Sequence, residues 1–89
     1  MTDDGVGPVL EASEVGHAIV AAIREANPGA TVVDRGSYLR VLVPGRCVVR
    51  ADAIARALGR PFTLPGDLEM AMPSFKGRIA IGDDEVVWS

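Results

Sequence analysis

The chain has 89 residues, of which 48% are hydrophobic and 24% are charged, so its composition is that of an ordinary globular domain and not of a disordered chain. Twelve acidic residues against nine basic ones give a net charge of −3, which argues against general binding to nucleic acid or anionic lipid. We expect one domain over residues 1–89, located in the cytoplasm, because the sequence has no apolar run long enough to cross a bilayer and no secretion signal at its start.

The first half of the chain predicts one strand, one helix and a hairpin. We expect residues 1–5 to form a mobile arm, and residues 6–10, with Gly7 and Pro8 among them, to form an edge strand or a loosely held arm. Two alternatives stay open for this arm: it orders on binding, or it is a frayed terminus with no role. Apolar residues at helical spacing follow Ser13, a good N-cap, and Pro28 ends this helix after Asn27. Residues 31–34 and 38–43 then read as two strands around a turn at 35–37.

The second half repeats this order. Residues 46–49 predict a strand, and residues 52–58 predict a short helix that lacks a capping residue and ends at Gly59. Leu68, Met70 and Met72 alternate with less apolar residues, as do Ile79 and Ile81, so both segments are predicted to be half-buried strands. A turn at residues 83–84 leads to a last strand, 85–88, which packs the only tryptophan into the core.

These elements indicate an α+β fold built from a duplicated β-α-β-β motif, with the two halves meeting near residues 44–45. The connections within each hairpin are too short for a parallel crossover, so the strands are expected to pair antiparallel. Two helices packed on one side of antiparallel sheet is the arrangement that this pattern favours.

Chemical groups suited to catalysis are sparse in this sequence. The only histidine, His17, and the only cysteine, Cys47, are thirty positions apart, so their spacing suggests no metal site. Cys47 lies in an apolar strand and is expected to be a small buried hydrophobe, although a Cys47-dependent enzyme stays an alternative. Six arginines, here called the arginine band, have Tyr38 as the only aromatic among them, which is unlike a nucleic-acid surface: Arg35, Arg40, Arg46, Arg50, Arg56 and Arg60. A binding module is the remaining expectation.

Several segments, in this order and spacing, carry a resemblance to a known family: Val6-Gly7-Pro8-Val9, Asn27-Pro28-Gly29, Val33-Asp34-Arg35, Tyr38-Leu39-Arg40-Val41, Leu58-Gly59-Arg60-Pro61-Phe62, and Ser74-Phe75 followed by Gly77. Over about residues 5–88 the chain resembles the effector proteins of soluble bacterial multicomponent diiron monooxygenases, the MmoB/DmpM family. Within it, the toluene and alkene monooxygenase branch is the most similar. The resemblance differs at the second helix, where Arg50 and Ala51 stand in place of a capping residue.

The resemblance implies a non-catalytic effector, without metal or organic cofactor, that binds the large subunit of a diiron hydroxylase. Such an effector tunes the active-site conformation, turnover, coupling and regiospecificity of its partner. The expected contact residues lie before the first helix, at its end, after the second helix and near residue 75: Val6, Gly7, Pro8, Asn27, Pro28, Arg60, Ser74, Phe75 and Lys76. For Arg60, capping of the preceding helix is the favoured alternative, and an interaction module of an unrelated system with the same fold stays open as another function.

Overall fold

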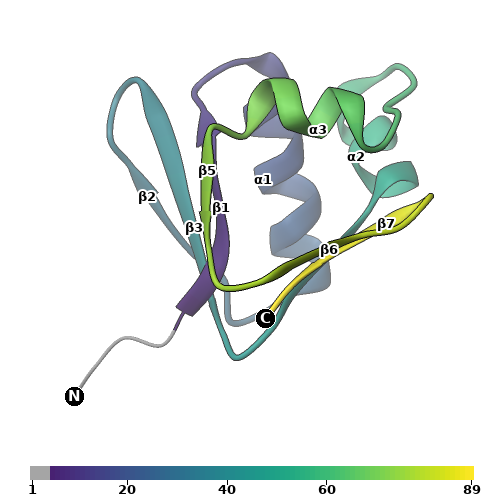
Figure 1. Ribbon diagram of the computed structural model, residues 1–89. Helices are drawn as coiled ribbons and strands as arrows, with labels where there is room; N and C mark the ends of the chain where they lie inside the picture. The colour runs from purple at the N-terminus through teal and green to yellow at the C-terminus, as the bar shows by residue number, and fades with distance from the viewer. Residues whose placement is uncertain (1–4) are drawn as a thin grey trace.

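The computed structural model describes residues 5–89, which form seven strands and three helices in two antiparallel sheets (Figure 1). The α+β prediction is confirmed. Within the described residues no helix has the length and apolar character needed to span a membrane.

The first sheet has the strand order β2-β3-β1-β5. It contains β1 (Gly5–Glu11), β2 (Thr31–Asp34), β3 (Tyr38–Pro44) and β5 (Ser74–Lys76). The hairpin of β2 and β3 was predicted correctly. Its turn is held by two bonds, since the Asp34 side chain accepts a hydrogen bond from the Gly36 amide at 2.8 Å and the Arg35 amide donates to the Tyr38 carbonyl at 2.9 Å.

Residues 6–10 were predicted to form an edge strand or a loose arm; they do form a strand, but its predicted place at the edge is wrong, because β1 is a central strand. It pairs with β3 on one side and with β5 on the other, and Gly5 lies opposite Pro44. The ladder to β3 omits Gly7 and Pro8, which pair with β5 instead, so a proline without an N–H group fits inside the sheet. The part of the expected mobile arm at residues 1–4 lies outside the described residues.

The second sheet has the strand order β4-β7-β6. Its strands are β4 (Cys47–Arg50), β6 (Ile79–Ile81) and β7 (Glu85–Trp88), as the sequence predicted within one residue. The two sheets are joined through the turn at Gly45 and the bend at Gly77.

Helix α1 (Glu14–Ala26) follows the sequence prediction at both ends. The Ser13 hydroxyl accepts a hydrogen bond from the Gly16 amide at 3.1 Å, and the helix ends at Asn27. Helix α2 (Ala51–Leu58) has no side-chain cap at Arg50 and ends at Gly59, whose φ of 83° is left-handed, also as predicted.

Helix α3 (Gly66–Ala71) replaces the strand predicted around Leu68, Met70 and Met72. In the helix Leu68 and Ala71 are buried three residues apart, whereas Met70 is 81% exposed. The Asp67 carboxylate accepts a hydrogen bond from the Thr63 amide at 2.8 Å, which fixes the first turn without a capping side chain at Pro65. The second half therefore departs from a plain β-α-β-β repeat, since α3 and β5 lie between α2 and the last hairpin.

The core lies between α1, α2, α3 and the inner faces of both sheets (Figure 1). Residues of both halves contribute its largest fully buried side chains: Leu10, Ile19, Ile23, Val41, Val49, Ile54, Leu68, Val86 and Trp88. Burial of Trp88 confirms its predicted place, although its indole N–H has no hydrogen-bond partner among the described residues.

Candidate docking surface

The predicted contact residues of β1 lie inside the protein. Gly7 and Pro8 are buried and Val6 is half-buried, each within a strand that has neighbours on both sides. A Cβ atom on Gly7 would stand 2.5 Å from the Val41 carbonyl oxygen, so this glycine permits a close approach between β1 and β3. These three residues shape the scaffold and offer little surface to a partner.

Asn27 was also predicted to meet a partner, but its side chain is 6% exposed and is used within the fold. Its Nδ2 group donates to the carbonyls of Ile23 at 2.8 Å and Val48 at 2.7 Å, and its Oδ1 accepts from the Val48 amide at 3.1 Å. One amide thus ends α1 and occupies the outer edge of β4. The neighbouring Pro28 is exposed, as expected of a contact residue.

Arg60 contacts an acidic side chain across the fold and not the last carbonyls of α2, so the capping prediction is wrong. Its Nη1 lies 3.1 Å from Oε1 of Glu14, at the start of α1. Both side chains are more than half exposed, so this pair adds little to stability and remains accessible to a partner.

Ser74, Phe75 and Lys76 form β5, at the edge of the first sheet, and all three are exposed. Phe75 is 40% exposed although it lies opposite the buried Pro8. The nine predicted residues do not form one patch. Pro28 and Arg60 lie at opposite ends of α1, which has 13 residues and is therefore about 20 Å long.

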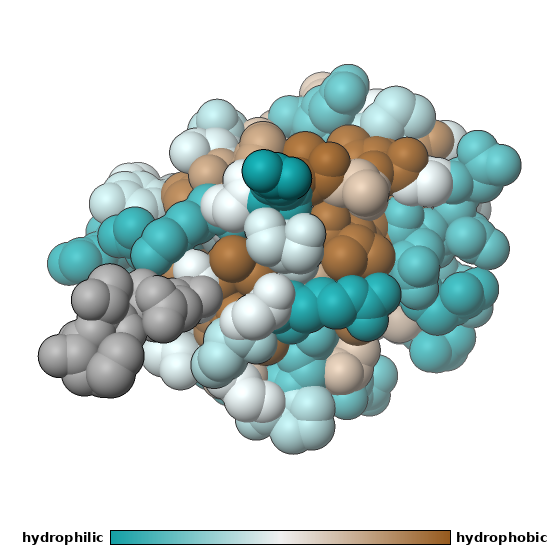
Figure 2. Space-filling view, turned by 60° about the horizontal axis from the view of Figure 1, so that its bottom comes forward, coloured by the Kyte–Doolittle hydropathy of each residue, from teal (hydrophilic) through white to brown (hydrophobic). Residues whose placement is uncertain are grey.

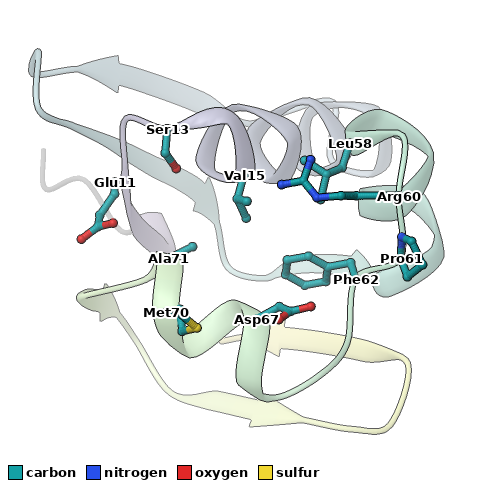
Figure 3. A pocket seen from close by; sticks show the side chains of 10 residues that line it. All are labelled: Glu11, Ser13, Val15, Leu58, Arg60, Pro61, Phe62, Asp67, Met70 and Ala71. Carbon is teal, nitrogen blue, oxygen red and sulfur yellow. The ribbon is translucent and has the colours of Figure 1, made fainter.

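A hollow beside Arg60 forms what we call the α3 groove (Figure 3). It has a volume of about 320 Å³ and lies between the first turn of α1, the end of α2 and α3. Apolar side chains make up most of its lining: Val15, Leu58, Pro61, Phe62, Met70 and Ala71. Polar side chains complete it: Glu11, Ser13, Arg60 and Asp67. Figure 3 shows the ring of Phe62 turned toward the interior, with the Arg60 side chain running along one side.

Met70 is the groove residue that the sequence prediction missed. The alternating pattern placed Met70 on the same buried strand face as Leu68. In a helix, however, residues that are two positions apart point in nearly opposite directions. The signal that was available is the Pro65-Gly66-Asp67 sequence, a helix start with an acidic residue in its first turn.

A second apolar area lies on the outer face of the second sheet. Val48, Val87 and Ala80 are neighbours across β4, β7 and β6, and in β4 and β7 they alternate with buried residues. Figure 2 brings the lower side of Figure 1 forward and shows hydrophobic surface in the middle of this face, with hydrophilic side chains around it. Val48 also lines a hollow of about 390 Å³ next to Pro28.

The arginine band is partly neutralised within the protein. Arg50 lies 3.2 Å from Asp52 and 3.5 Å from Asp84, and Arg56 lies 4.0 Å from Asp52. With the pair of Arg60 and Glu14, three of the six arginines of the band contact acidic side chains.

Cys47 does not have the surroundings of a nucleophile. Its side chain is fully buried in β4, and burial raises the pKa of the thiol from 9.0 to about 12. The thiolate, which is the reactive form, is therefore scarce at neutral pH, and the hypothesis of a Cys47-dependent enzyme is wrong. Within residues 5–89 no three His, Cys, Asp or Glu side chains gather as metal ligands would.

Fold and surface together define a small α+β binding protein. The family model described as the MmoB/DmpM family matches residues 4–89, so the chain belongs to this family. A curated relative from Xanthobacter autotrophicus (strain Py2), the effector subunit of an alkene monooxygenase system, is 38% identical over 90 residues. That match covers 99% of this chain and 88% of the relative.

Solved structures show the same fold. The regulatory protein B of soluble methane monooxygenase matches with a TM-score of 0.73 and 25% identity, over 100% of this chain and 67% of that protein. A chain in a phenol hydroxylase–regulatory protein complex matches with a TM-score of 0.84 and 20% identity, over 96% of this chain and 97% of that chain. The resemblance that the sequence motifs suggested is therefore confirmed at the level of the family.

Proposed function

We propose that this protein is the non-catalytic effector of a multicomponent diiron monooxygenase and binds the large subunit of its hydroxylase component. The observation that carries the proposal is the 38% identity, over nearly the whole chain, to an effector subunit of an alkene monooxygenase system. The buried, protonated thiol of Cys47 supports a role without chemistry of its own. Such a protein works in the cytoplasm, together with its hydroxylase. An interaction module of an unrelated system is the weaker alternative, because it would not account for the family match.

The effector acts by preferring one conformation of its partner. A binding protein shifts an equilibrium between two hydroxylase conformations by its difference in affinity for them, and by no more than that. A difference of about 3 kcal/mol changes the population ratio by roughly a hundredfold. Turnover, coupling and product distribution then change together, since all three depend on the shape of the same active site.

We assign docking to the α3 groove and the adjoining strand β5. Met70 is 81% exposed and Phe75 is 40% exposed, and large apolar side chains kept at a surface are typical of protein interfaces. Methionine is also well suited to packing against a partner surface, because its side chain is flexible and polarisable. Arg60 lines the same groove as Met70, and Ser74 and Lys76 flank Phe75 in β5 with their side chains on the other face of the strand. Pro28, at the other end of α1, would belong to a separate contact.

Titration of the effector into hydroxylase, reductase and electron carrier tests the function. We expect no oxidation by the effector alone, and a saturable rise in product formation with an altered product distribution when it is added. A rate and a product distribution that stay flat through saturation would refute the effector role.

Met70→Lys tests the docking surface, and Ser37→Lys is its matched control. Ser37 is exposed in the turn between β2 and β3, so the control adds the same charge at another exposed site. We expect Met70→Lys to raise the effector concentration at half-maximal stimulation by at least about tenfold, equivalent to about 1.4 kcal/mol, with little change for Ser37→Lys. Equal effects of the two variants would remove the α3 groove from the interface and leave the effector function intact.

A further inference from the structure

The two edges of the second sheet differ. At β4 the edge is occupied, because the side-chain amide of Asn27 makes both hydrogen bonds that a neighbouring strand would make with Val48. At β6, the opposite edge, no described strand or side chain takes this place. Protein sheets usually protect their edges, so an edge left open invites pairing with another strand.

The register shows which groups of β6 point outward. Arg78 and Ser89 exchange two backbone hydrogen bonds of 2.7 and 2.8 Å, and the Gly82 amide donates to the Glu85 carbonyl at 2.8 Å. Hydrogen-bonded pairs alternate along an antiparallel ladder, so Ala80 also bonds to Val87, whereas the N–H and C=O groups of Ile79 and Ile81 face away from β7. Neither residue has a hydrogen bond on that side within residues 5–89.

We propose that β6 is a self-association edge, at which a second copy of this chain adds its own β6 antiparallel about a two-fold axis at Ala80. Ile79 of one copy then lies opposite Ile81 of the other, and each of these two pairs exchanges two backbone hydrogen bonds. The two three-stranded sheets become one sheet of six strands.

Side chains at this edge are complementary to themselves. Ile79 and Ile81 lie on the inner face with Trp88 and Val86, and Ile81 is 38% exposed. Pairing with Ile79 of the second copy covers this exposed isoleucine with an apolar, β-branched neighbour. On the outer face, the row of Val48, Val87 and Ala80 continues into the same row of the second copy.

Charge also favours this partner over an unrelated strand. In the two-fold register Arg78 lies opposite Gly82 of the second copy and next to Asp83 of that copy. Neither Arg78 nor Asp83 forms an ion pair within the part of the chain that the structure describes. The two-fold axis brings each arginine to the other copy's aspartate, as a closed, symmetric interface requires.

The contact is short, so the dimer is weak. Each copy contributes only the three residues of β6, so the contact buries much less than the roughly 1,000 Å² of a stable interface. We therefore expect a dimer that forms at high protein concentration and dissociates on dilution. Because β6 lies outside the α3 groove, this inference does not depend on the proposed function.

Disulfide trapping with Ala80→Cys tests the register. The two Ala80 residues form a non-hydrogen-bonded pair with Cα atoms about 4.5 Å apart, a separation that a disulfide can span. The native Cys47 is buried and does not compete. Ala57→Cys, at an exposed position of α2, is the control for random collisions. We expect the Ala80→Cys variant to form its disulfide-linked dimer at least about tenfold faster than the control under mild oxidation; equal rates would overturn the proposal.

A charge swap in the Ala80→Cys background tests the ion pairs. Arg78→Asp or Asp83→Arg alone should slow the trapping severalfold, and the two together should restore it, because the pair is re-formed with reversed charges. Failure of the double variant to recover would overturn the two-fold register.

For the unmodified protein, the amide NMR signals of Ile79 and Ile81 should shift between dilute and concentrated samples more than those of Ala80. Signals that do not move up to millimolar concentration would overturn the dimer without any variant.

Discussion

The two halves of the protein are stabilised differently. In the first half, α1 is capped by Ser13, ends on Asn27 and contributes six buried residues to the core. In the second half, α2 lacks a side-chain cap and buries only Ile54, and α3 buries only Leu68 and Ala71. The two longest strands, β1 and β3 with seven residues each, lie in the first half, and the two shortest, β5 and β6 with three each, lie in the second.

This difference shows how a small protein separates stability from binding. Local signals are strong in the first half, which supplies β1, β2, β3 and α1 of the scaffold. The second half depends on contacts with that scaffold, and it also carries the exposed Met70 and Phe75 that we assign to docking. Segments with few buried contacts are the ones that adjust most easily when a partner binds.

The largest expected effect comes from removing the main packing residue of the second half. Trp88→Ala should lower the free energy of unfolding by about 3–5 kcal/mol, because it leaves a large cavity in a protein whose total stability is on the order of 5–10 kcal/mol. Urea unfolding followed by circular dichroism measures this loss. Trp88→Phe, which keeps most of the ring and removes the unpartnered N–H, should lose much less. A loss below about 1 kcal/mol for Trp88→Ala would mean that the second half does not depend on this ring.

Asn27→Ala tests the connection between the halves. It removes the two hydrogen bonds that join the end of α1 to Val48 in β4, so we expect a loss of about 2–3 kcal/mol in unfolding free energy. Trp88 fluorescence during urea unfolding reports it. Asn27→Asp keeps the acceptor for the Val48 amide but not the donor to the Val48 carbonyl. Its free energy of unfolding should lie between those of the natural protein and Asn27→Ala. No change in Asn27→Ala would show that water replaces the amide at this edge.

Gly16→Ala tests whether local preference or packing governs the first half. Helix propensity alone predicts a gain of about 1 kcal/mol. In the fold, however, a Cβ atom on Gly16 would overlap the carbonyl oxygen of Glu11, so we expect a net loss of about 1–3 kcal/mol. Ala21→Gly, at an exposed position of α1, is the control and should lose about 1 kcal/mol through propensity. A more stable Gly16→Ala protein would contradict the close contact between β1 and α1.

The smallest effect concerns Cys47, which reports how well the second half is closed. Because burial raises the pKa of this thiol to about 12, the folded state keeps it protonated while the unfolded thiol ionises near pH 9. Its contribution to stability is therefore complete below pH 9 and is lost as the pH rises from 9 toward 12. Between pH 9 and 12 the free energy of unfolding of the natural protein should fall because of this thiol, and Cys47→Ala should not show this part of the fall.

Alkylation gives an independent measure of the same burial. Iodoacetamide at about pH 8 should modify Cys47 far more slowly in the folded protein than in urea, since the reaction needs the exposed thiolate. Equal rates in the two states would show that the second sheet opens readily.

Element prediction succeeded where local signals are strong. Ser13 and Asn27 mark both ends of α1, Gly59 marks the end of α2, and the turn at residues 83–84 marks the start of the last strand. The prediction failed at residues 66–71, because the spacing of Leu68, Met70 and Met72 is compatible with a strand and with a short helix. Of the predicted contact residues, Arg60, Ser74, Phe75 and Lys76 are exposed and only Arg60 lines the α3 groove, whereas Gly7, Pro8 and Asn27 are buried.

The order and type of most elements, the absence of paired reactive groups and the family resemblance are properties of the sequence itself, because they depend on spacing and residue type along the chain. The central place of β1, the pairing of Arg60 with Glu14, the closure of β4 by Asn27 and the exposure of Met70 arise only in the tertiary structure. Each of these depends on residues distant in sequence that compete for the same neighbours, and a linear pattern does not contain the outcome of that competition.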